Sequence, residues 1–248
     1  MTPTGKTLLL IGATSDIGRA IAGRYAKAGW SLVLAARTLA DAEREARDMT
    51  TRFAVPVRPV VLDVLDMDQL RSFPATLDPA PDTVVSVVGV LGDQARAEAD
   101  IDYAAQVLRA NFEGPALILG AFAQIMAARG SGAIVGVSSV AGERGRALLY
   151  VYGAAKAGLT TFLSGLRQRL AGAGVRVVTI KPGYVRTRMT EGLSLPAPLT
   201  AAPQEVAEAV FRAAEIGGAE VIYVRWPWRW IMVIIKLMPE FIFKKVRF

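Results

Sequence analysis

The chain has 248 residues, a formal net charge of +7 and a hydrophobic fraction of 52%. This length suits one sizeable α/β domain, and no Gly-, Ser- or Pro-rich linker divides it. Because the sequence contains no cysteine and no histidine, disulfides, thiolate nucleophiles, imidazole bases and the usual zinc sites are excluded. Any proton transfer must therefore use Asp, Glu, Lys or Tyr, and we expect no metal site.

The N-terminal segment leads directly into the first predicted strand. Its apolar run, residues 7–11, is short and ends in a glycine-rich turn, unlike the longer apolar core and small-residue cleavage site of a secretory signal. No apolar run approaches the ~18 uncharged residues that a membrane-spanning helix needs. We therefore expect a cytoplasmic protein without a transmembrane helix.

Continuous apolar runs alternate with amphipathic segments along the chain. Such runs are typical of strands buried on both faces of a parallel sheet. The predicted strands are residues 7–11, 31–36, 57–62, 82–88, 133–137, 175–180 and 220–224. The predicted helices are residues 17–28, 39–53, 100–110, 114–129 and 150–170. This alternation predicts a single α/β domain built on a doubly wound, seven-stranded parallel sheet of the Rossmann type, with helices on both faces.

A glycine-rich turn, Gly12-Ala-Thr-Ser-Asp-Ile-Gly18, joins the first strand to the first helix. A strand, a tight turn and a helix in this order direct free backbone N–H groups and the positive helix end toward an anion, which suits a dinucleotide pyrophosphate. A tight turn that binds nothing is the alternative. The candidate cofactor contacts in this segment are Gly12, Thr14, Ser15, Asp16, Ile17 and Gly18.

The ends of the next three strands supply further candidates for cofactor binding. The second strand ends at Arg37, where an acidic residue would suit ribose hydroxyls and an arginine suits a 2′-phosphate. Arg37 therefore favours NADP(H), with NAD(H) and a merely solvated arginine as alternatives. Asp63, followed by Val64, either hydrogen-bonds the adenine or caps the next turn. Gly89 follows the fourth strand, where a small residue lets the backbone approach a ribose.

Tyr152 and Lys156 are four residues apart in a predicted helix, so they share one face. A tyrosine titrates near ~10, but a nearby ammonium would lower its pKa and allow acid–base work. This spacing also arises by chance in many helices. Ser139 falls at the carboxyl end of the fifth strand, the edge where open α/β sheets bind ligands. Asn111 lies between two predicted helices, where an asparagine is more often a cap or kink than a catalytic group.

Taken in order, the glycine turn, Ser139, Tyr152, Lys156 and Pro182-Gly183 resemble the motifs of the short-chain dehydrogenase/reductase family over residues 7–224. The resemblance implies an NAD(P)-dependent enzyme that reduces a ketone to a secondary alcohol by hydride transfer, and a homo-oligomer. It implies that Ser139 positions the carbonyl, Tyr152 exchanges the proton and Lys156 binds the nicotinamide ribose. It also implies that Asn111 holds a water relay. The further cofactor contacts that it implies are Tyr152, Lys156, Pro182, Gly183, Val185 and Thr187.

Two departures from the family pattern concern the cofactor. Asp16 stands where the family usually has a second glycine. Its side chain would narrow the approach of the backbone to the pyrophosphate, and its carboxylate would repel phosphate unless it caps the helix instead. Ser86-Val-Val-Gly89 replaces the family's Asn-Asn-Ala-Gly and loses polar groups that would brace the sheet edge.

Several segments resemble one branch of the family, the reductases that act on decaprenylphosphoryl-2-keto-erythro-pentose. They are residues 16–18, 90–93, 138–144, 152–156, 181–189 and the aromatic carboxyl-terminal segment. The resemblance implies a hydrophobic, lipid-linked keto sugar as substrate and a partner oxidase that supplies it. Residues 188–203 are expected to cover this substrate. The alternatives are the same chemistry on another hydrophobic ketone or alcohol, and a non-catalytic NAD(P)-binding scaffold or sensor, which the two departures favour.

Residues 226–248 form a basic aromatic tail after the dinucleotide-binding and catalytic domain predicted at residues 1–225. Pro239 cannot continue a helix smoothly, so we expect two short helices, the second beginning at or near it. On a helix at ~100° per residue, one narrow polar side would carry Arg229, Lys236, Glu240, Lys244 and Arg247.

The composition of this tail suggests its partner. Aromatic residues beside basic ones, with a wide apolar face, suit a helix lying in a membrane interface. We therefore expect a peripheral position on the inner face of the membrane, with packing against a sister subunit as the alternative. Nucleic acid is not expected as a partner, because the chain has no basic patch outside this tail and no recognised binding motif.

Overall fold

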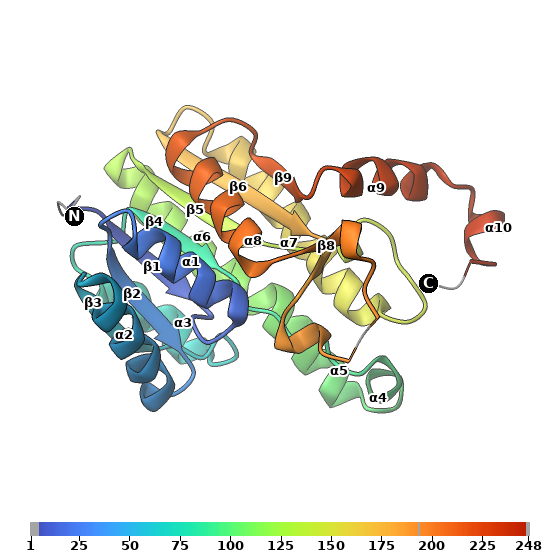
Figure 1. Ribbon diagram of the computed structural model, residues 1–248, viewed down its shortest axis with the longest axis horizontal. Coiled ribbons are helices and arrows are strands. Elements are labelled where there is room, and N and C mark those ends of the chain that lie inside the picture. The colour runs from blue at the N-terminus through green and yellow to red at the C-terminus, as the bar shows by residue number, and fades with distance from the viewer. Residues whose placement is uncertain (1–4, 193, 247–248) are drawn as a thin grey trace.

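A parallel sheet forms the centre of the molecule. The computed structural model describes residues 5–192 and 194–246, and within them the seven strands have the order β3-β2-β1-β4-β5-β6-β9 (Figure 1). They are β1 (Thr7–Ile11), β2 (Ser31–Ala36), β3 (Val57–Val61), β4 (Thr83–Ser86), β5 (Gly132–Val137), β6 (Val175–Pro182) and β9 (Val221–Val224). The predicted doubly wound parallel sheet is confirmed, and each predicted strand is present.

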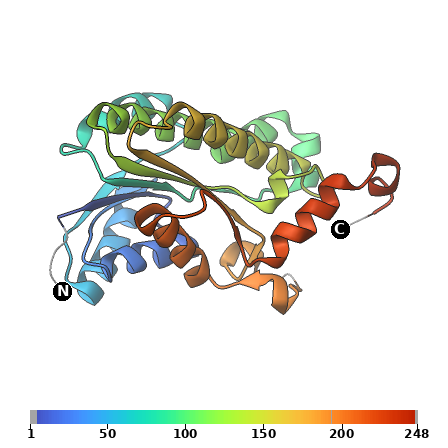
Figure 2. The same ribbon diagram turned by 90° about the horizontal axis from the view of Figure 1, so that it is seen from above.

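Helices cover both faces of this sheet (Figure 2). One face packs against α1 (Asp16–Ala26), α2 (Leu39–Phe53) and α8 (Pro203–Phe211). The other packs against α3 (Met67–Ser72), α6 (Gly114–Arg129) and α7 (Tyr150–Arg169). Two shorter helices, α4 (Gln94–Ala99) and α5 (Ile101–Leu108), precede α6 and contact α7.

The first strand shows why two hydrophobic cores form. Successive side chains of a strand point to opposite faces, so an unbroken apolar run buries both faces. Leu8 and Leu10 belong to the core beneath α1 and α8, whereas Leu9 and Ile11 belong to the core beneath α6 and α7. All four side chains are at most 1% exposed. The continuous apolar pattern therefore predicted a central strand correctly.

The strand order reverses between β1 and β4. The chain winds outward from β1 through β2 to β3, and then returns to place β4 on the other side of β1. The connections on the two sides of this point lie on opposite faces of the sheet, which opens a crevice at the carboxyl ends of β1 and β4. The glycine turn, residues 12–18, follows β1 at this crevice.

Several short elements were not predicted from the sequence. They include α3, α4, α8 and a two-stranded parallel sheet of β7 (Tyr184–Val185) and β8 (Thr200–Ala201). Caps rather than periodic apolar patterns define the shortest of them: Asp66 accepts hydrogen bonds from the first N–H groups of α3, and Asp93 caps α4 in the same way. A helix of six residues is too short to show helical periodicity.

The tail extends from the end of β9, at the carboxyl edge of the sheet (Figures 1 and 2). It contains α9 (Pro227–Leu237) and α10 (Glu240–Phe243), and Pro239 is the N-cap residue of α10. The break predicted at Pro239 is therefore confirmed. Arg247 lies outside the described residues. None of the helices in the described ranges has the length and hydropathy needed to cross a bilayer.

Candidate active site

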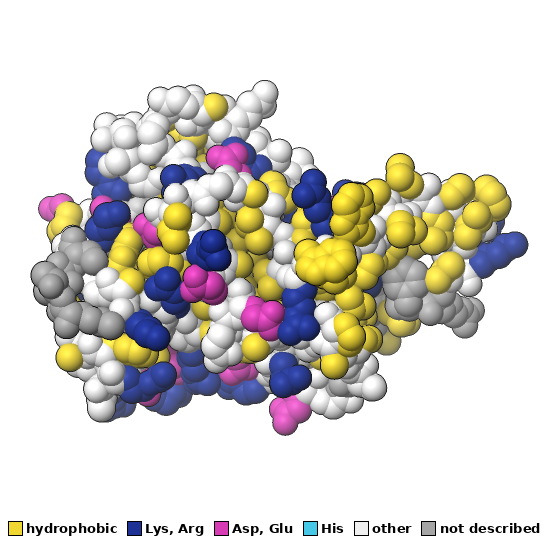
Figure 3. Space-filling model, turned by 45° about the horizontal axis from the view of Figure 1, so that its top comes forward, with side chains coloured by type: hydrophobic (Ala, Val, Ile, Leu, Met, Phe, Trp, Pro, Cys, Tyr) yellow, Lys and Arg dark blue, Asp and Glu magenta, His cyan; other side chains and the backbone are white. Residues whose placement is uncertain are grey.

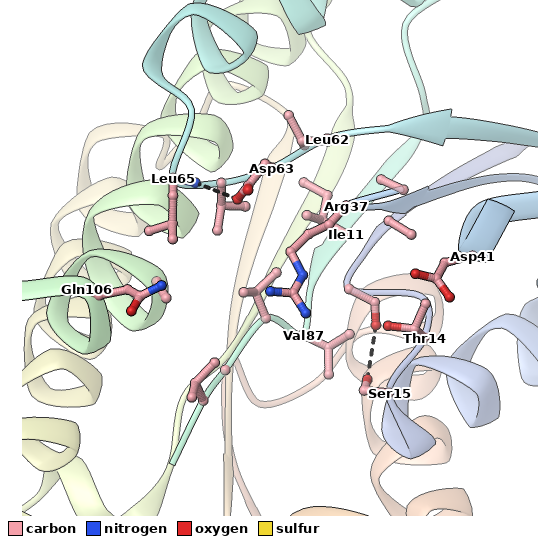
Figure 4. Close-up of a pocket in the computed structure, with 18 of the residues that line it drawn as sticks. Ile11, Thr14, Ser15, Arg37, Asp41, Leu62, Asp63, Leu65, Val87 and Gln106 are labelled. Atoms are coloured by element: carbon pink, nitrogen blue, oxygen red, sulfur yellow. Dashed lines mark hydrogen bonds between the residues drawn. The ribbon is translucent and has the colours of Figure 1, made fainter. Parts of the chain in front are cut away.

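A cleft of about 420 Å³ opens at the reversal point between β1 and β4. Figure 4 shows its lining, which comes from the ends of β1 to β4 and from α5. The cleft brings together residues from Ile11 to Ala110, 99 positions apart along the chain. The predicted cofactor contacts that line it are Gly12, Thr14, Ser15, Arg37, Asp63, Val64 and Gly89.

The glycine turn leaves space for a ligand because two of its residues have no side chain. Gly12 has φ +92°, and a Cβ at this position would lie 3.2 Å from the backbone nitrogen of Val88. A Cβ on Gly18 would lie 2.5 Å from the carbonyl oxygen of Gly12, so α1 packs directly on the turn. The hydroxyl of Ser15 accepts a hydrogen bond from the Gly18 N–H at 3.0 Å and caps the helix. The first backbone N–H groups of α1 have no acceptor within the helix and suit a pyrophosphate.

Asp16 does not line this cleft, and its carboxylate does not cap α1. Asp16 Oδ2 accepts a hydrogen bond from the Arg188 backbone N–H at 2.8 Å, and Oδ1 lies 3.4 Å from Arg188 Nε. Arg188 in turn donates to the carbonyl oxygen of Thr14 at 2.6 Å. The alternative that Asp16 caps the helix is wrong, because Ser15 is the cap and the Asp16 carboxylate is engaged by the loop that follows β7. Its negative charge is compensated there rather than presented to a phosphate.

Arg37 extends from the end of β2 into the cleft (Figure 4). The carboxylate of Asp41 also lines the cleft, but the hydroxyl of Thr38 and the guanidinium of Arg44 bind it and lower its pKa. Arg37 contributes to the same lowering by its charge. This wall of the cleft therefore presents the cation of Arg37 next to a carboxylate that is ion-paired with Arg44.

Asp63 serves the turn and the cleft together. Its Oδ1 accepts a hydrogen bond from the Leu65 N–H at 3.0 Å, so the carboxylate caps the turn after β3. It also lines the cleft, together with Val64 (Figure 4). The two alternatives considered from the sequence are compatible, since a carboxylate has more than one acceptor site.

Ser139 and Tyr152 meet at the carboxyl end of β5. Ser139 begins a short 3-10 turn, Val140–Gly142, and its Oγ accepts from the Ala141 N–H at 3.1 Å. Tyr152 lies in the first turn of α7, with its hydroxyl near that of Ser139. Burial raises the pKa of Tyr152, while the interaction with Ser139 and the charge of Arg146 lower it. The expectation that Lys156 lowers the pKa of Tyr152 below its usual value is wrong for this structure, because burial dominates.

Lys156 connects the catalytic helix to the wall of the cleft. Its side chain is nearly fully buried, and Nζ donates to the carbonyl oxygens of Val88 at 3.0 Å and Val137 at 3.2 Å. Burial lowers the pKa of this ammonium to about 8. Nζ lies 5.8 Å from the centroid of the Tyr152 ring, over its face. A Cβ on Gly89 would lie 3.2 Å from Lys156 Nζ, so the glycine leaves room for the ammonium.

Asn111 lies in a π-helical turn, Arg109–Glu113, that joins α5 to α6 without the break expected from the sequence. Its side chain is fully buried. Nδ2 donates to the carbonyl oxygens of Val90 and Val107, and Oδ1 accepts from the Val90 N–H. The amide thereby fixes the strand extension after Gly89. The structural interpretation of an asparagine at this position is supported, and the water relay stays a prediction.

The residues at and after the end of β6 do not line this cleft. Pro182 is the last residue of β6, and Val185 is buried in β7. Thr187, with Asp16, lines a second cavity of about 540 Å³ that also carries Arg186 and Arg188. The described cleft therefore does not include the predicted contacts Ile17, Gly18, Pro182, Gly183, Val185 and Thr187.

Gly183 has a neighbour that the sequence did not indicate. A Cβ on Gly183 would lie 2.0 Å from the indole of Trp228, which belongs to α9. The same indole packs edge-on against Tyr184, with the ring centroids 5.3 Å apart. The Pro182-Gly183 turn therefore packs against the tail, and it is also a candidate cofactor contact.

Arg146 is a functional candidate that sequence reasoning missed. It lies in the loop between Ser139 and α7, is partly buried, and interacts electrostatically with Tyr184 and Tyr152. Burial lowers the pKa of this guanidinium. No motif marks it, because its place beside Tyr152 depends on how the loop folds back. Within the described ranges, no group of three or more His, Cys, Asp or Glu side chains could hold a metal ion.

Comparison with known proteins identifies this arrangement. The family model of the short chain dehydrogenases matches residues 6–196. An uncharacterised oxidoreductase of Mycobacterium tuberculosis is 38% identical over 242 residues, covering 96% of each chain. An NADP-dependent 3-hydroxy acid dehydrogenase of Schizosaccharomyces pombe is 31% identical over 194 residues, covering 75% of this chain and 74% of its own. A solved short chain dehydrogenase/reductase family protein, 31% identical, superposes with a TM-score of 0.80 over 90% of this chain and 97% of its own.

The chain therefore belongs to the short-chain dehydrogenase family. It is an NAD(P)-dependent oxidoreductase with a Rossmann-type fold. The glycine cradle, the first turn of α1 and the cation of Arg37 fit a nicotinamide dinucleotide in the cleft.

Proposed function

We propose that this enzyme is an NADP(H)-preferring reductase that converts the ketone of a polyprenyl-phosphate-linked 2-keto pentose to a secondary alcohol. The reaction type rests on one observation, the placement of Tyr152 next to Ser139 at the carboxyl end of β5. This pair lies beside Lys156, whose ammonium is bonded to Val88 in the wall of the dinucleotide cleft.

The two hydroxyl groups suit a carbonyl whose oxygen gains negative charge. Tyr152 donates a proton to that oxygen, and Ser139 donates a second hydrogen bond that stabilises the developing alkoxide. Because burial raises the pKa of Tyr152, the phenol stays protonated at neutral pH and acts as the acid. The bound nicotinamide supplies the hydride in this reaction. Lys156 holds its positive charge between the strand ends, where a ribose hydroxyl can replace a carbonyl acceptor.

The preference for NADP(H) over NAD(H) is supported by Arg37. The guanidinium projects into the cleft at the end of β2, where it can bind a 2′-phosphate through charge-assisted hydrogen bonds. The related enzyme from Schizosaccharomyces pombe is named as NADP-dependent.

Two features support a phosphorylated lipid as the substrate. Arg146 supplies a partly buried cation beside Tyr152, which suits a phosphate near the reacting ketone. Exposed apolar side chains lie on two loops near the site: Leu148 is in the loop that carries Arg146, and Met189 follows β7. The same apolar surroundings favour a second candidate, another hydrophobic ketone without phosphate.

The substrate proposal is tested by steady-state kinetics with NADPH. We expect the polyprenylphosphoryl keto pentose to exceed, by at least 100-fold in kcat/KM, both the free keto pentose and a long-chain keto lipid without phosphate. Equal activity on the keto lipid would reject the phosphorylated sugar while leaving the ketone reductase intact. Arg146→Gln should lower kcat/KM only for the phosphorylated substrate.

Two partner proposals accompany this function. A 2-keto sugar arises by oxidation of a secondary alcohol, so a partner oxidase supplies the substrate. Exposed Leu108, Phe112 and Leu117, on α5, the following turn and α6, support a homo-oligomer. Light scattering of the purified enzyme would measure the subunit number.

A further inference from the structure

Helix α9 has an apolar face that packs on the domain. Trp228 and Met232 are buried, and they form a small core with Val140, which lies in the loop between β5 and α7. Tyr184 and Leu199, from the segments that follow β6, pack against this core. The indole of Trp228 also donates a hydrogen bond to the carbonyl oxygen of Leu199 at 2.9 Å. The inner face of the tail thus joins three segments that border the active site.

The polar side chains of the tail also turn toward the domain. Lys236 Nζ lies 2.6 Å from the carboxylate of Glu143, which also binds Lys181 and the hydroxyl of Tyr223. Glu240 pairs with Arg144 at 2.7 Å. Two members of the predicted polar side, Lys236 and Glu240, therefore face the domain, because the loop after β5 offers them partners of opposite charge.

Arg144 fixes the end of α9 through the backbone. Its guanidinium donates to the carbonyl oxygens of Ile235 and Met238 in the last turn of the helix. It also lies over the ring of Phe243, 3.9 Å from the centroid. The tail is thus held along its length by residues four and five positions after Ser139.

The opposite face of the tail is apolar and exposed. At about 100° per residue, Trp230, Val233, Ile234 and Leu237 fall within a single arc of roughly 100° on α9. Trp230 is 60% exposed, Ile234 65% and Leu237 77%. Trp226 before α9 and Phe241 in α10 extend the same surface. Figure 3 shows hydrophobic side chains gathered along the projecting tail. We call this set of six side chains the outer face.

Exposed cations accompany the outer face. Arg229, Lys244 and Lys245 are exposed, whereas Arg225 is paired with Glu205. In a two-fold dimer formed through this surface, the same patch on both subunits would bring these like charges together. An anionic lipid surface has the opposite charge, and tryptophan with lysine or arginine is typical of helices that lie in the membrane interface.

We propose that the outer face of the tail lies in the surface of an anionic lipid membrane. The inner face then holds Val140, Tyr184 and Leu199, and with them the substrate side of the active site, next to the lipid. An apolar substrate can reach Tyr152 from the bilayer surface without crossing bulk water. The membrane contact itself does not depend on which ketone the enzyme reduces.

The proposal is tested by co-sedimentation of the whole enzyme with vesicles. We compare 30% phosphatidylglycerol in phosphatidylcholine with pure phosphatidylcholine at low ionic strength. The wild-type enzyme should bind the anionic vesicles at least tenfold more tightly. Trp230→Gln combined with Leu237→Gln should reduce this binding at least tenfold. Ile101→Gln combined with Ile216→Gln, which removes equally exposed apolar groups elsewhere, should bind as the wild type does.

A second pair of changes separates charge from apolar contact. Lys244→Gln combined with Lys245→Gln should reduce binding to anionic vesicles at least threefold and leave binding to neutral vesicles unchanged. Surface substitutions are preferable to deletion of the tail, since deletion would expose the domain surface at Gly183 against which Trp228 packs. NADPH binding by each variant reports that it is folded.

Two outcomes would overturn the proposal. One is a wild-type enzyme that does not sediment with anionic vesicles. The other is a Trp230→Gln, Leu237→Gln variant that turns a dimer into a monomer in light scattering while vesicle binding is unchanged. In that case the outer face would be a subunit interface.

Discussion

The two halves of the active-site edge are built in different ways. The cofactor half, at the ends of β1, β2 and β4, is shaped mainly by backbone: Gly12, Gly18 and Gly89 stand where a Cβ would meet neighbouring atoms at 2.5 to 3.2 Å. The substrate half, after β5 and β6, is shaped by side chains that reach across the chain. There Arg144 holds carbonyl groups of the tail 91 and 94 residues later.

The difference shows which changes each half tolerates. Backbone N–H groups can bind a pyrophosphate with few requirements on side chains, so the cofactor half tolerates substitution at most positions other than its glycines. A site formed by side chains changes its shape and charge when those side chains are substituted, so the substrate half can be adapted to a particular substrate. The catalytic residues lie between the two halves, and Lys156 is bonded to both: to Val88 at the end of β4 and to Val137 at the end of β5.

The largest expected effect concerns the group between the two halves. Tyr152→Phe removes the proton donor, so we expect kcat to fall by about 10²–10⁴-fold. The affinity for NADPH should change little, because the cleft is lined by other residues. Tyr150→Phe, two residues earlier in α7 and 45% exposed, is the matched control and should keep full activity. Unchanged turnover in Tyr152→Phe would remove Tyr152 from the mechanism.

A pH dependence of stability should reveal the burial of Lys156. Its pKa is about 8 in the folded protein and 10.5 when exposed, so between these values the unfolded state binds more protons. Stability should therefore rise with pH from 8 to 10.5, by on the order of 3 kcal/mol. Urea unfolding without cofactor would measure the rise, and Lys156→Met should lack it. A parallel pH profile for the two proteins would contradict the burial of a charged lysine.

A matched pair of glycines tests the contrast directly. In Gly18→Ala the new methyl would meet the Gly12 carbonyl, and in Gly183→Ala it would meet the Trp228 indole. Each should cost about 1–3 kcal/mol of unfolding free energy, measured by denaturant titration. Gly18→Ala should also weaken NADPH binding at least tenfold, whereas Gly183→Ala should mainly shift tryptophan fluorescence.

The control for this pair is a glycine in an open environment. Gly165 lies within α7, and a Cβ there would have nothing within 4 Å. Gly165→Ala should be neutral or stabilise the protein by about 0.5–1 kcal/mol. If Gly18→Ala binds NADPH as the wild type does, the backbone account of the cofactor half is wrong.

The smallest expected effect is on the choice of cofactor. Arg37→Ala should weaken NADPH binding about tenfold or more, because a charge-assisted hydrogen bond contributes roughly 1.5–3 kcal/mol. NADH binding should stay within a factor of two. Fluorescence titration with both cofactors measures this ratio, and equal losses for both would show that Arg37 does not recognise the 2′-phosphate.

The sequence predicted those features that depend on neighbouring residues. The apolar run of β1, the glycine turn and the four-residue spacing of Tyr152 and Lys156 each carry their information within one turn or strand. Parallel strands that alternate with helices also place their carboxyl ends at one edge, so the meeting of Ser139 with Tyr152 followed from the fold class.

Other site features depend on contacts between distant segments. The sequence suggested that the Asp16 carboxylate would repel phosphate, but Arg188, 172 residues later in the chain, donates a hydrogen bond to this carboxylate. Arg146 had no motif at all, and nothing near Gly183 in the sequence indicated its contact with Trp228. No local pattern could have shown these pairs, because each joins loops whose paths the sheet determines.

By itself, the sequence determined the α/β sheet and singled out the glycine turn, Ser139, Tyr152 and Lys156 as site candidates, since hydrophobic periodicity and short-range spacing mark them. Only the tertiary structure decided that burial raises the pKa of Tyr152 and that Lys236, on the polar side of the tail, pairs with Glu143 of the domain. Both outcomes have the same physical reason. Desolvation and ion pairing depend on what surrounds a group in space, and the neighbours of Tyr152 and Lys236 come together only when the loops after β5 and β6 fold against the tail.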